Sequence, residues 1–119
     1  MKRRRLVVAS LAACVAAPVR AHAFLEHAEP RVGSVVKTAP SELRLSFSEP
    51  IEGAFSTAKV LDAAGRRVDK GDVRVEPAER GVLRVSLLPL AAGAYTVQWR
   101  AVSVDTHVTT GSFGFRIAP

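Results

Sequence analysis

The sequence predicts an all-β domain of immunoglobulin-like type, a β-sandwich or barrel. Apolar and polar residues alternate in several short segments, which is the period of a half-buried strand. Clusters of Gly, Pro, Ser and Asp separate these segments and are typical of turns. No segment after residue 21 shows a helical period of useful length. The combination favours one antiparallel β domain, which the chain length of 119 residues also allows.

Seven segments are expected to be strands. The clearest spans residues 95–100, where Tyr95, Val97 and Trp99 fall on one face, and residues 113–117 alternate in the same way at the end of the chain. We expect the aromatic residues of both segments to lie in the core. The other expected strands are residues 22–30, 43–47, 55–62, 73–75 and 82–87.

The first 21 residues have the features of a secretory signal peptide. Residues 2–5 are all basic, and residues 6–17 are almost entirely apolar but too short to span a bilayer. Pro18 then breaks the apolar segment. We therefore expect residues 1–21 to be removed on export, and residues 22–119 to form the mature domain.

The cleavage position decides which residue begins the mature protein. Cleavage after Ala21 leaves His22 at the N-terminus, whereas cleavage after Ala23 is also permitted and leaves Phe24. A third alternative is lipidation of Cys14, because residues 11–14 resemble a bacterial lipoprotein box. We favour cleavage after Ala21, since the apolar segment continues beyond Cys14.

The basic charge of the whole chain comes mostly from its first residues. The chain has 17 Lys and Arg against 11 Asp and Glu, but five of the basic residues and none of the acidic ones lie in residues 1–21. Residues 22–119 therefore carry 12 basic and 11 acidic residues, a formal charge of +1. This near balance gives no support for a nucleic-acid partner. Because Cys14 is the only cysteine, the mature domain has neither a disulfide nor a thiolate metal ligand.

Three polar residues form a candidate metal site. On a strand, Asp105 and His107 would point to the same face, because they are two residues apart. A histidine at a free N-terminus, here His22, can bind a metal ion through both its α-amine and its Nδ1 atom. Three nitrogens and one oxygen suit Cu(II), and the affinity order favours copper over Zn(II) for a shared set of ligands. On the residues alone, a turn aspartate beside a surface histidine remains an alternative.

His27 is expected to be a surface histidine without a role at the metal. It lies five residues after His22, so on a continuous strand the two side chains would face opposite ways.

Three segments resemble the CopC family of copper-binding proteins in order and spacing. They are HAFLEHAEPRVGS (residues 22–34), APSELRLSFSEPIEGAFS (39–56) and LPLAAGAYTVQWRAVSVDTHVTTGSFGF (88–115). The resemblance implies a periplasmic Greek-key β-sandwich that binds one Cu(II) ion for copper resistance or homeostasis. The family's copper ligands carry over to His22, Asp105 and His107, and Glu49 becomes a candidate for an outer or weak axial position. A CopD-type membrane copper protein is the partner that the resemblance suggests.

The sequence departs from some family members at a second site. Those members carry a methionine-rich loop that binds Cu(I), but the only methionine here is Met1, which is lost with the signal peptide. The equivalent residues 62–70 contain no thioether. Because soft ligands select Cu(I), we expect this chain to lack that site and to bind Cu(II) only.

Two other classes of function compete with copper binding. An N-terminal histidine clasp also resembles the copper centre of polysaccharide monooxygenases, which are oxidative enzymes. Such an enzyme needs an open metal position and exposed aromatic residues, whereas Asp105 would occupy a position here and Tyr95 and Trp99 are expected to be buried. We therefore do not expect an enzyme. A metal-free immunoglobulin-like module would be favoured if the mature chain began at Phe24.

Overall fold

The computed structural model describes residues 23–119, which form eight strands and contain no helix. The predictions for residues 1–21, including Cys14, and for His22 lie outside the described residues. Nothing in residues 23–119 forms a helix long and apolar enough to cross a membrane. The strands are β1 (Leu25–Glu29), β2 (Val35–Val36), β3 (Glu42–Phe47), β4 (Thr57–Leu61), β5 (Arg74–Glu76), β6 (Glu79–Ser86), β7 (Gly93–Val102) and β8 (Val108–Ile117).

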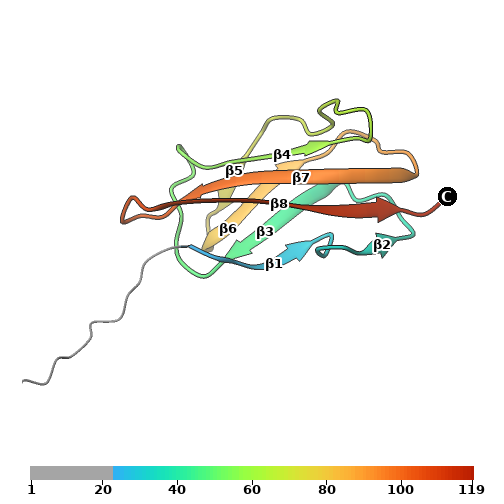
Figure 1. The fold of residues 1–119 in the computed structure, drawn as a ribbon. Helices are drawn as coiled ribbons and strands as arrows, with labels where there is room; N and C mark the ends of the chain where they lie inside the picture. Colours follow the sequence, from blue (N-terminus) through green and yellow to red (C-terminus); the bar gives the residue numbers. More distant parts are fainter. Residues whose placement is uncertain (1–22) are drawn as a thin grey trace, which may run out of the picture.

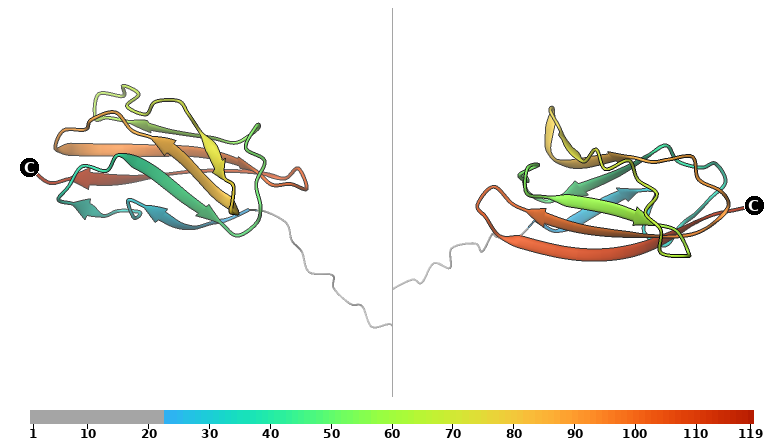
Figure 2. Two further views of the ribbon diagram at one scale, coloured as in Figure 1. Left: turned by 180° about the vertical axis from the view of Figure 1, so that it is seen from behind. Right: turned by 90° about the horizontal axis from the view of Figure 1, so that it is seen from above.

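The strands form two four-stranded sheets that face each other as the layers of a sandwich (Figures 1 and 2). The strand order is β1-β3-β6-β5 in the first sheet and β2-β8-β7-β4 in the second. All pairs are antiparallel except β2 with β8. The chain crosses between the sheets several times, for example between β3 and β4, so β5–β6 and β7–β8 are the only sheet neighbours among the described strands that are consecutive in sequence. This is the Greek-key arrangement of immunoglobulin-like sandwiches, which confirms the predicted fold class.

A tyrosine near the start of β7 adds a second feature of this fold class. The Tyr95 hydroxyl donates a hydrogen bond of 2.6 Å to the backbone carbonyl of Ala91, four residues upstream. Immunoglobulin-like sandwiches use the same contact, called a tyrosine corner, where a strand begins after a crossover. The Tyr95 ring stacks on Phe115 of the neighbouring strand, with ring centroids 5.4 Å apart.

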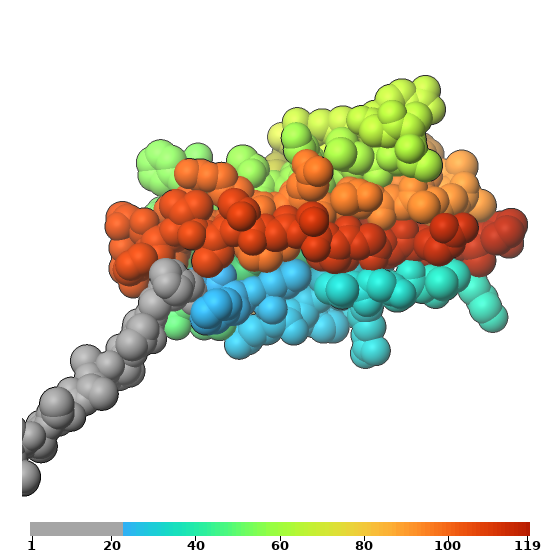
Figure 3. Space-filling view, in the orientation of Figure 1, coloured from blue at the N-terminus to red at the C-terminus, as the bar shows by residue number. Residues whose placement is uncertain are grey.

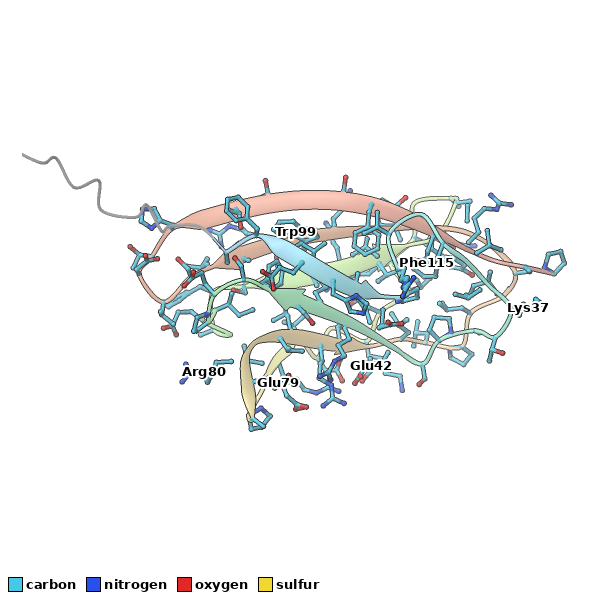
Figure 4. All side chains as sticks on the ribbon, turned by 90° about the horizontal axis from the view of Figure 1, so that it is seen from below. Lys37, Glu42, Glu79, Arg80, Trp99 and Phe115 are labelled. Carbon is cyan, nitrogen blue, oxygen red and sulfur yellow. The ribbon has the colours of Figure 1, made fainter. Side chains whose placement is uncertain are left out.

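The core consists of the inward-facing residues of both sheets, as the alternation predicts. Val97 is fully buried, and Trp99 packs edge to face on Phe47 of the opposite sheet at a centroid distance of 5.1 Å. Figure 4 shows Trp99 and Phe115 between the two sheets. Because residues 23–119 contain no cysteine, no disulfide supplements this apolar packing.

The outer face of the first sheet carries a network of alternating charges. Arg84 on β6 donates hydrogen bonds to Glu42 on β3 and Glu76 on β5, and Arg74 also reaches Glu42. Figure 4 shows Glu42 on this outer side. These cross-strand pairs occupy the polar positions of the alternating pattern. Each adds only a modest amount to stability, because the side chains are partly exposed.

The largest differences from the expected strands are at β2 and β8. The two-residue strand β2 was not expected, because Val35 and Val36 are too short a segment to show a period. β8 begins at Val108 rather than at residue 113, because it pairs with β7 over ten residues. The polar and glycine-containing start of β8 has no apolar period, so only this pairing defines it as a strand.

Gly111 gives a test of this packing. Its cross-strand neighbour is Trp99, and a Cβ atom on Gly111 would lie 2.7 Å from Cε2 and 3.0 Å from Nε1 of that ring. Gly111→Ala should lower the free energy of unfolding by about 1–3 kcal/mol, because the ring is held by Phe47 and cannot move aside freely. Chemical denaturation followed by the fluorescence of the single tryptophan measures this. Ser112→Ala, at the next, exposed position, is the control, and an equal loss there would contradict the explanation.

Candidate metal centre

Asp105 and His107 lie in the turn that joins β7 to β8, at one end of the sandwich (Figure 1). They therefore do not lie on a strand, which is the case in which their two-residue spacing would place them on one face. Thr106 between them has φ = 72°, in the left-handed region that a β-branched residue rarely adopts. The side chains nevertheless meet, because the turn folds them together: His107 Nδ1 is 3.2 Å from Asp105 Oδ1. The Asp105 and His107 side chains are 52% and 51% exposed, so a metal ion can reach them.

Ser103 stabilises this turn through hydrogen bonds of its side chain and backbone. It is only 1% exposed, and its hydroxyl donates a hydrogen bond to the Asp105 carboxylate and accepts one from the backbone N–H of His107. The Ser103 backbone N–H also donates to the His107 carbonyl at 2.9 Å. Both candidate ligands are thus fixed by one buried residue, which limits the number of turn conformations available to them.

These contacts favour the ionised form of Asp105. The Ser103 hydroxyl and then the His107 side chain lower the pKa of the Asp105 carboxyl to about 2. The carboxylate is therefore charged and ready to bind a cation throughout the neutral and mildly acidic range.

The distance between the two donor atoms suits neighbouring positions on one metal ion. Metal bonds of about 2 Å to nitrogen and oxygen, meeting at a right angle, separate two donors by about 2.8 Å. The observed 3.2 Å between Nδ1 and Oδ1 needs only a small adjustment. Within residues 23–119, however, no group of three or more His, Cys, Asp or Glu side chains forms a metal-binding cluster. The pair therefore needs further ligands from outside these residues or from solvent.

The start of the described chain lies beside this turn. The Thr109 hydroxyl, two residues after His107, donates a hydrogen bond of 2.8 Å to the Ala23 carbonyl. On the other side, Phe24 exchanges two hydrogen bonds with Ser48, each 2.9 Å long. Figure 3 shows the beginning of the described chain, in blue, next to the orange-red end of the β7–β8 hairpin. Residues far apart in the sequence therefore meet at this end of the sandwich.

Glu49 lies in the loop after β3, close to the same turn. The backbone N–H of Val104 donates to the carbonyl of Pro50 at 3.2 Å, which places the Glu49–Pro50 segment against the turn. Glu49 does not join Asp105 and His107 in a cluster of three potential ligands. Its suggested outer or axial role stays a prediction.

His27 is about half exposed and pairs with Glu29, with 2.8 Å between Nε2 and Oε2. The expected surface position is observed, but the regular alternation assumed for this segment is interrupted. β1 has an irregularity between Leu25 and His27, so Glu26 and His27 are both exposed. A bulge of this kind inserts a residue and breaks the two-residue period.

Comparison with known proteins identifies the family. The model of the CopC domain matches residues 25–118, which is most of the chain. The chain belongs to the CopC family. Copper resistance protein C of Pseudomonas syringae pv. tomato is 37% identical over 109 residues, which cover 87% of this chain and 86% of the relative. Copper transport protein CutJ of Bacillus subtilis (strain 168) is 32% identical over 98% of this chain, but this chain spans only 22% of that longer protein.

Solved structures agree with this assignment. CopC from Methylosinus trichosporium OB3b superposes with a TM-score of 0.77 at 31% identity, covering 82% of this chain and 95% of that protein. PcoC, a methionine-rich copper resistance protein from Escherichia coli, gives a TM-score of 0.73 at 36% identity, covering 82% and 99%. The chain therefore belongs to a family of copper resistance and copper transport proteins with a β-sandwich fold.

The sequence analysis did not find the residues that support the turn. Ser103 lies two residues before Asp105, and a small polar residue at this spacing is a signal that a hydroxyl could position the carboxylate. Thr109 and Ser48 gave no comparable signal. Thr109 contacts a residue 86 positions away, and no local pattern reports such a contact.

Ser103 leads to a prediction about Asp105 in the metal-free protein. Asp105 should titrate near pH 2, and Ser103→Ala should raise its pKa, because the Ser103 hydroxyl is the largest cause of the lowering. The folded pKa lies below the ordinary value, so Asp105 stabilises the fold above about pH 4 and loses this contribution as the pH falls towards 2.

An NMR titration of the Asp105 carboxyl carbon measures this pKa directly. Ser112→Ala, which removes an exposed hydroxyl from β8, should leave the Asp105 pKa unchanged. An Asp105 pKa near 3.8 in the unsubstituted protein would show that the hydrogen bonds in the turn do not form in solution.

Proposed function

We propose that this CopC-family chain is an exported protein that binds one Cu(II) ion and sequesters or delivers it in copper resistance or homeostasis. The observation that carries the proposal is the Asp105–His107 pair, whose donor atoms are 3.2 Å apart in an ordered turn. His22 would add its α-amine and imidazole nitrogen. The resulting three nitrogens and one oxygen form a set typical of Cu(II).

The contacts of Ala23 support a mature chain that begins at His22. Ala23 is fully buried in the core, and its carbonyl accepts the hydrogen bond from Thr109. Cleavage after Ala23 would remove this residue, whereas cleavage after Ala21 keeps it. A chain retained from Cys14 would place about eight residues before His22 and remove its free amine. We therefore infer export to the periplasm with cleavage after Ala21.

The proposal is for binding rather than catalysis. The relatives with descriptive names are copper resistance and copper transport proteins. Tyr95 is buried, and Trp99 packs against the core, so neither contributes to an exposed aromatic surface for a polysaccharide.

A membrane copper protein of the CopD type remains our proposed partner. The Bacillus relative supports it, because there the region similar to this chain is about a fifth of a longer copper transport protein. A domain that is part of a transport protein in one organism can serve a separate transport protein in another.

The mature start is the first test. Intact mass of the exported protein should show His22 as the first residue, and titration should show one Cu(II) bound per chain. The affinity should fall on acidification, because an α-amine with a pKa near 8 and two imidazoles with a pKa near 6.5 must lose protons to bind. A mature protein that begins at Phe24, or that carries lipid on Cys14, would contradict the proposed ligand set.

Substitution of the ligands gives the second test. His107→Ala should weaken Cu(II) binding by more than about a hundredfold, since even residues that only support a ligand cost about 10–100-fold. The electron paramagnetic resonance spectrum should show one nitrogen fewer. Asp105→Ala should also weaken binding but keep all the nitrogens.

His27→Ala is the matched control, because it removes an exposed histidine that is outside the proposed ligand set. It should leave the affinity and the spectrum unchanged. The metal-free variants should all remain folded, because the core does not include these side chains, although Asp105→Ala also loses the hydrogen bond from Ser103. An equal loss of affinity in His27→Ala and His107→Ala would refute the proposed ligands.

A further inference from the structure

We propose that Thr109 is a positioning residue, which fixes the beginning of the mature chain so that the N-terminal ligand lies next to Asp105 and His107. This inference rests on the proposed function and adds a role to a residue that is not itself a ligand. The observation is the hydrogen bond of 2.8 Å from the Thr109 hydroxyl to the Ala23 carbonyl.

The position of Thr109 in β8 connects the two parts of the site. It follows His107 by two residues, and it pairs with Ala101 at the end of the hairpin that carries the turn. Ala23 precedes β1 of the opposite sheet, so this hydrogen bond joins the chain start to the strand that leads out of the metal-binding turn. His22 is covalently bonded to Ala23, and consecutive Cα atoms of a chain are separated by only about 3.8 Å. Fixing Ala23 therefore restricts where the α-amine and imidazole can be.

The environment of Thr109 and Ala23 favours a fixed geometry for the hydrogen bond between them. Thr109 points into the sandwich, with its side chain only partly exposed, whereas Thr110 points outward. Because threonine is β-branched, its χ1 angle is restricted, and the direction of its hydroxyl group is limited even without the contact to Ala23. Ala23 is fully buried, and a buried carbonyl that loses its donor costs free energy.

Ser48 holds the next residue by a separate route. The Phe24 N–H donates to the Ser48 side chain, and the Ser48 N–H donates to the Phe24 carbonyl, both at 2.9 Å. Residues 23 and 24 are thus held from both sheets, by Thr109 from β8 and by Ser48 from the end of β3. Without these hydrogen bonds from Thr109 and Ser48, residues 23 and 24 would have to become ordered each time a metal ion binds, at a cost in conformational entropy.

Three variants of the full mature protein separate positioning from general stability. Thr109→Val keeps the shape and removes the hydroxyl, Thr109→Ser keeps the hydroxyl, and Thr110→Val makes the same chemical change on the exposed side of the same strand. Thr109→Val should weaken Cu(II) binding about tenfold or more, the scale expected for ordering one or two backbone residues. Thr109→Ser should restore most of the affinity, and Thr110→Val should leave it unchanged.

A readout without copper tests the same idea. In the metal-free protein the Phe24 amide should be protected from hydrogen exchange, and Thr109→Val should make it exchange faster while amides in the centre of β7 keep their protection. A purely structural role for Thr109 would instead lower protection in β7 and β8 together. Retained protection of Phe24 and unchanged copper affinity in Thr109→Val would overturn the proposal.

The result also distinguishes this inference from the proposed function. The unsubstituted protein reports on the function: a copper spectrum without the N-terminal nitrogens would refute the ligand set, whatever Thr109 does. If those nitrogens are present, a deletion of His22 provides the remaining comparison. Thr109→Val should weaken copper binding in the chain that begins at His22 and have little further effect in the chain that lacks it. Equal effects in both would refute positioning and leave the proposed function intact.

Discussion

The ten-residue antiparallel pairing of β7 with β8 is the constraint on which the rest of the candidate site depends. It begins at Gly93 and ends at Val102, so the chain must reverse within the five residues from Ser103 to His107. In a reversal this short, the buried Ser103 hydroxyl bonds both the Asp105 carboxylate and the His107 backbone. The same pairing fixes Thr109, and therefore the contact with the chain start. One hairpin thus determines the position of three groups that act at this end of the sandwich.

The candidate ligands and their supports differ in burial. Asp105 and His107 are about half exposed, whereas Ser103 and Ala23 are completely or almost completely buried. A buried hydroxyl or carbonyl has to keep its hydrogen bond, because water cannot replace the partner. The supporting residues are therefore ordered by the fold itself. Ordered donor atoms lower the entropy cost of binding any ligand, while the exposed Asp105 and His107 side chains stay accessible to solvent.

The sequence predicted the fold class well because local alternation reports which residues face the core. Val97 and Phe115 are buried as expected, and the glycine and proline turns lie between the strands. Short or polar strands were harder to predict: β2 has only two residues, and the start of β8 contains Thr109, Thr110 and Gly111, which show no apolar period. Pairing with a long neighbouring strand defines such segments, and a single sequence does not report that pairing.

The candidate site was predicted in part, and the physical reason lies in the range of its contacts. Asp105 and His107 were recognisable as a pair from their spacing, whereas their place in a turn with Thr106 at a positive φ was not predicted. A left-handed threonine is a rare conformation that is retained when surrounding contacts hold it, and the Ser103 hydrogen bonds provide those contacts. The link from Thr109 to Ala23 spans 86 residues and leaves no local trace in the sequence. The turn that carries the candidate ligands therefore has its own local signal, whereas the placement of the chain start beside it is a property of the folded sandwich.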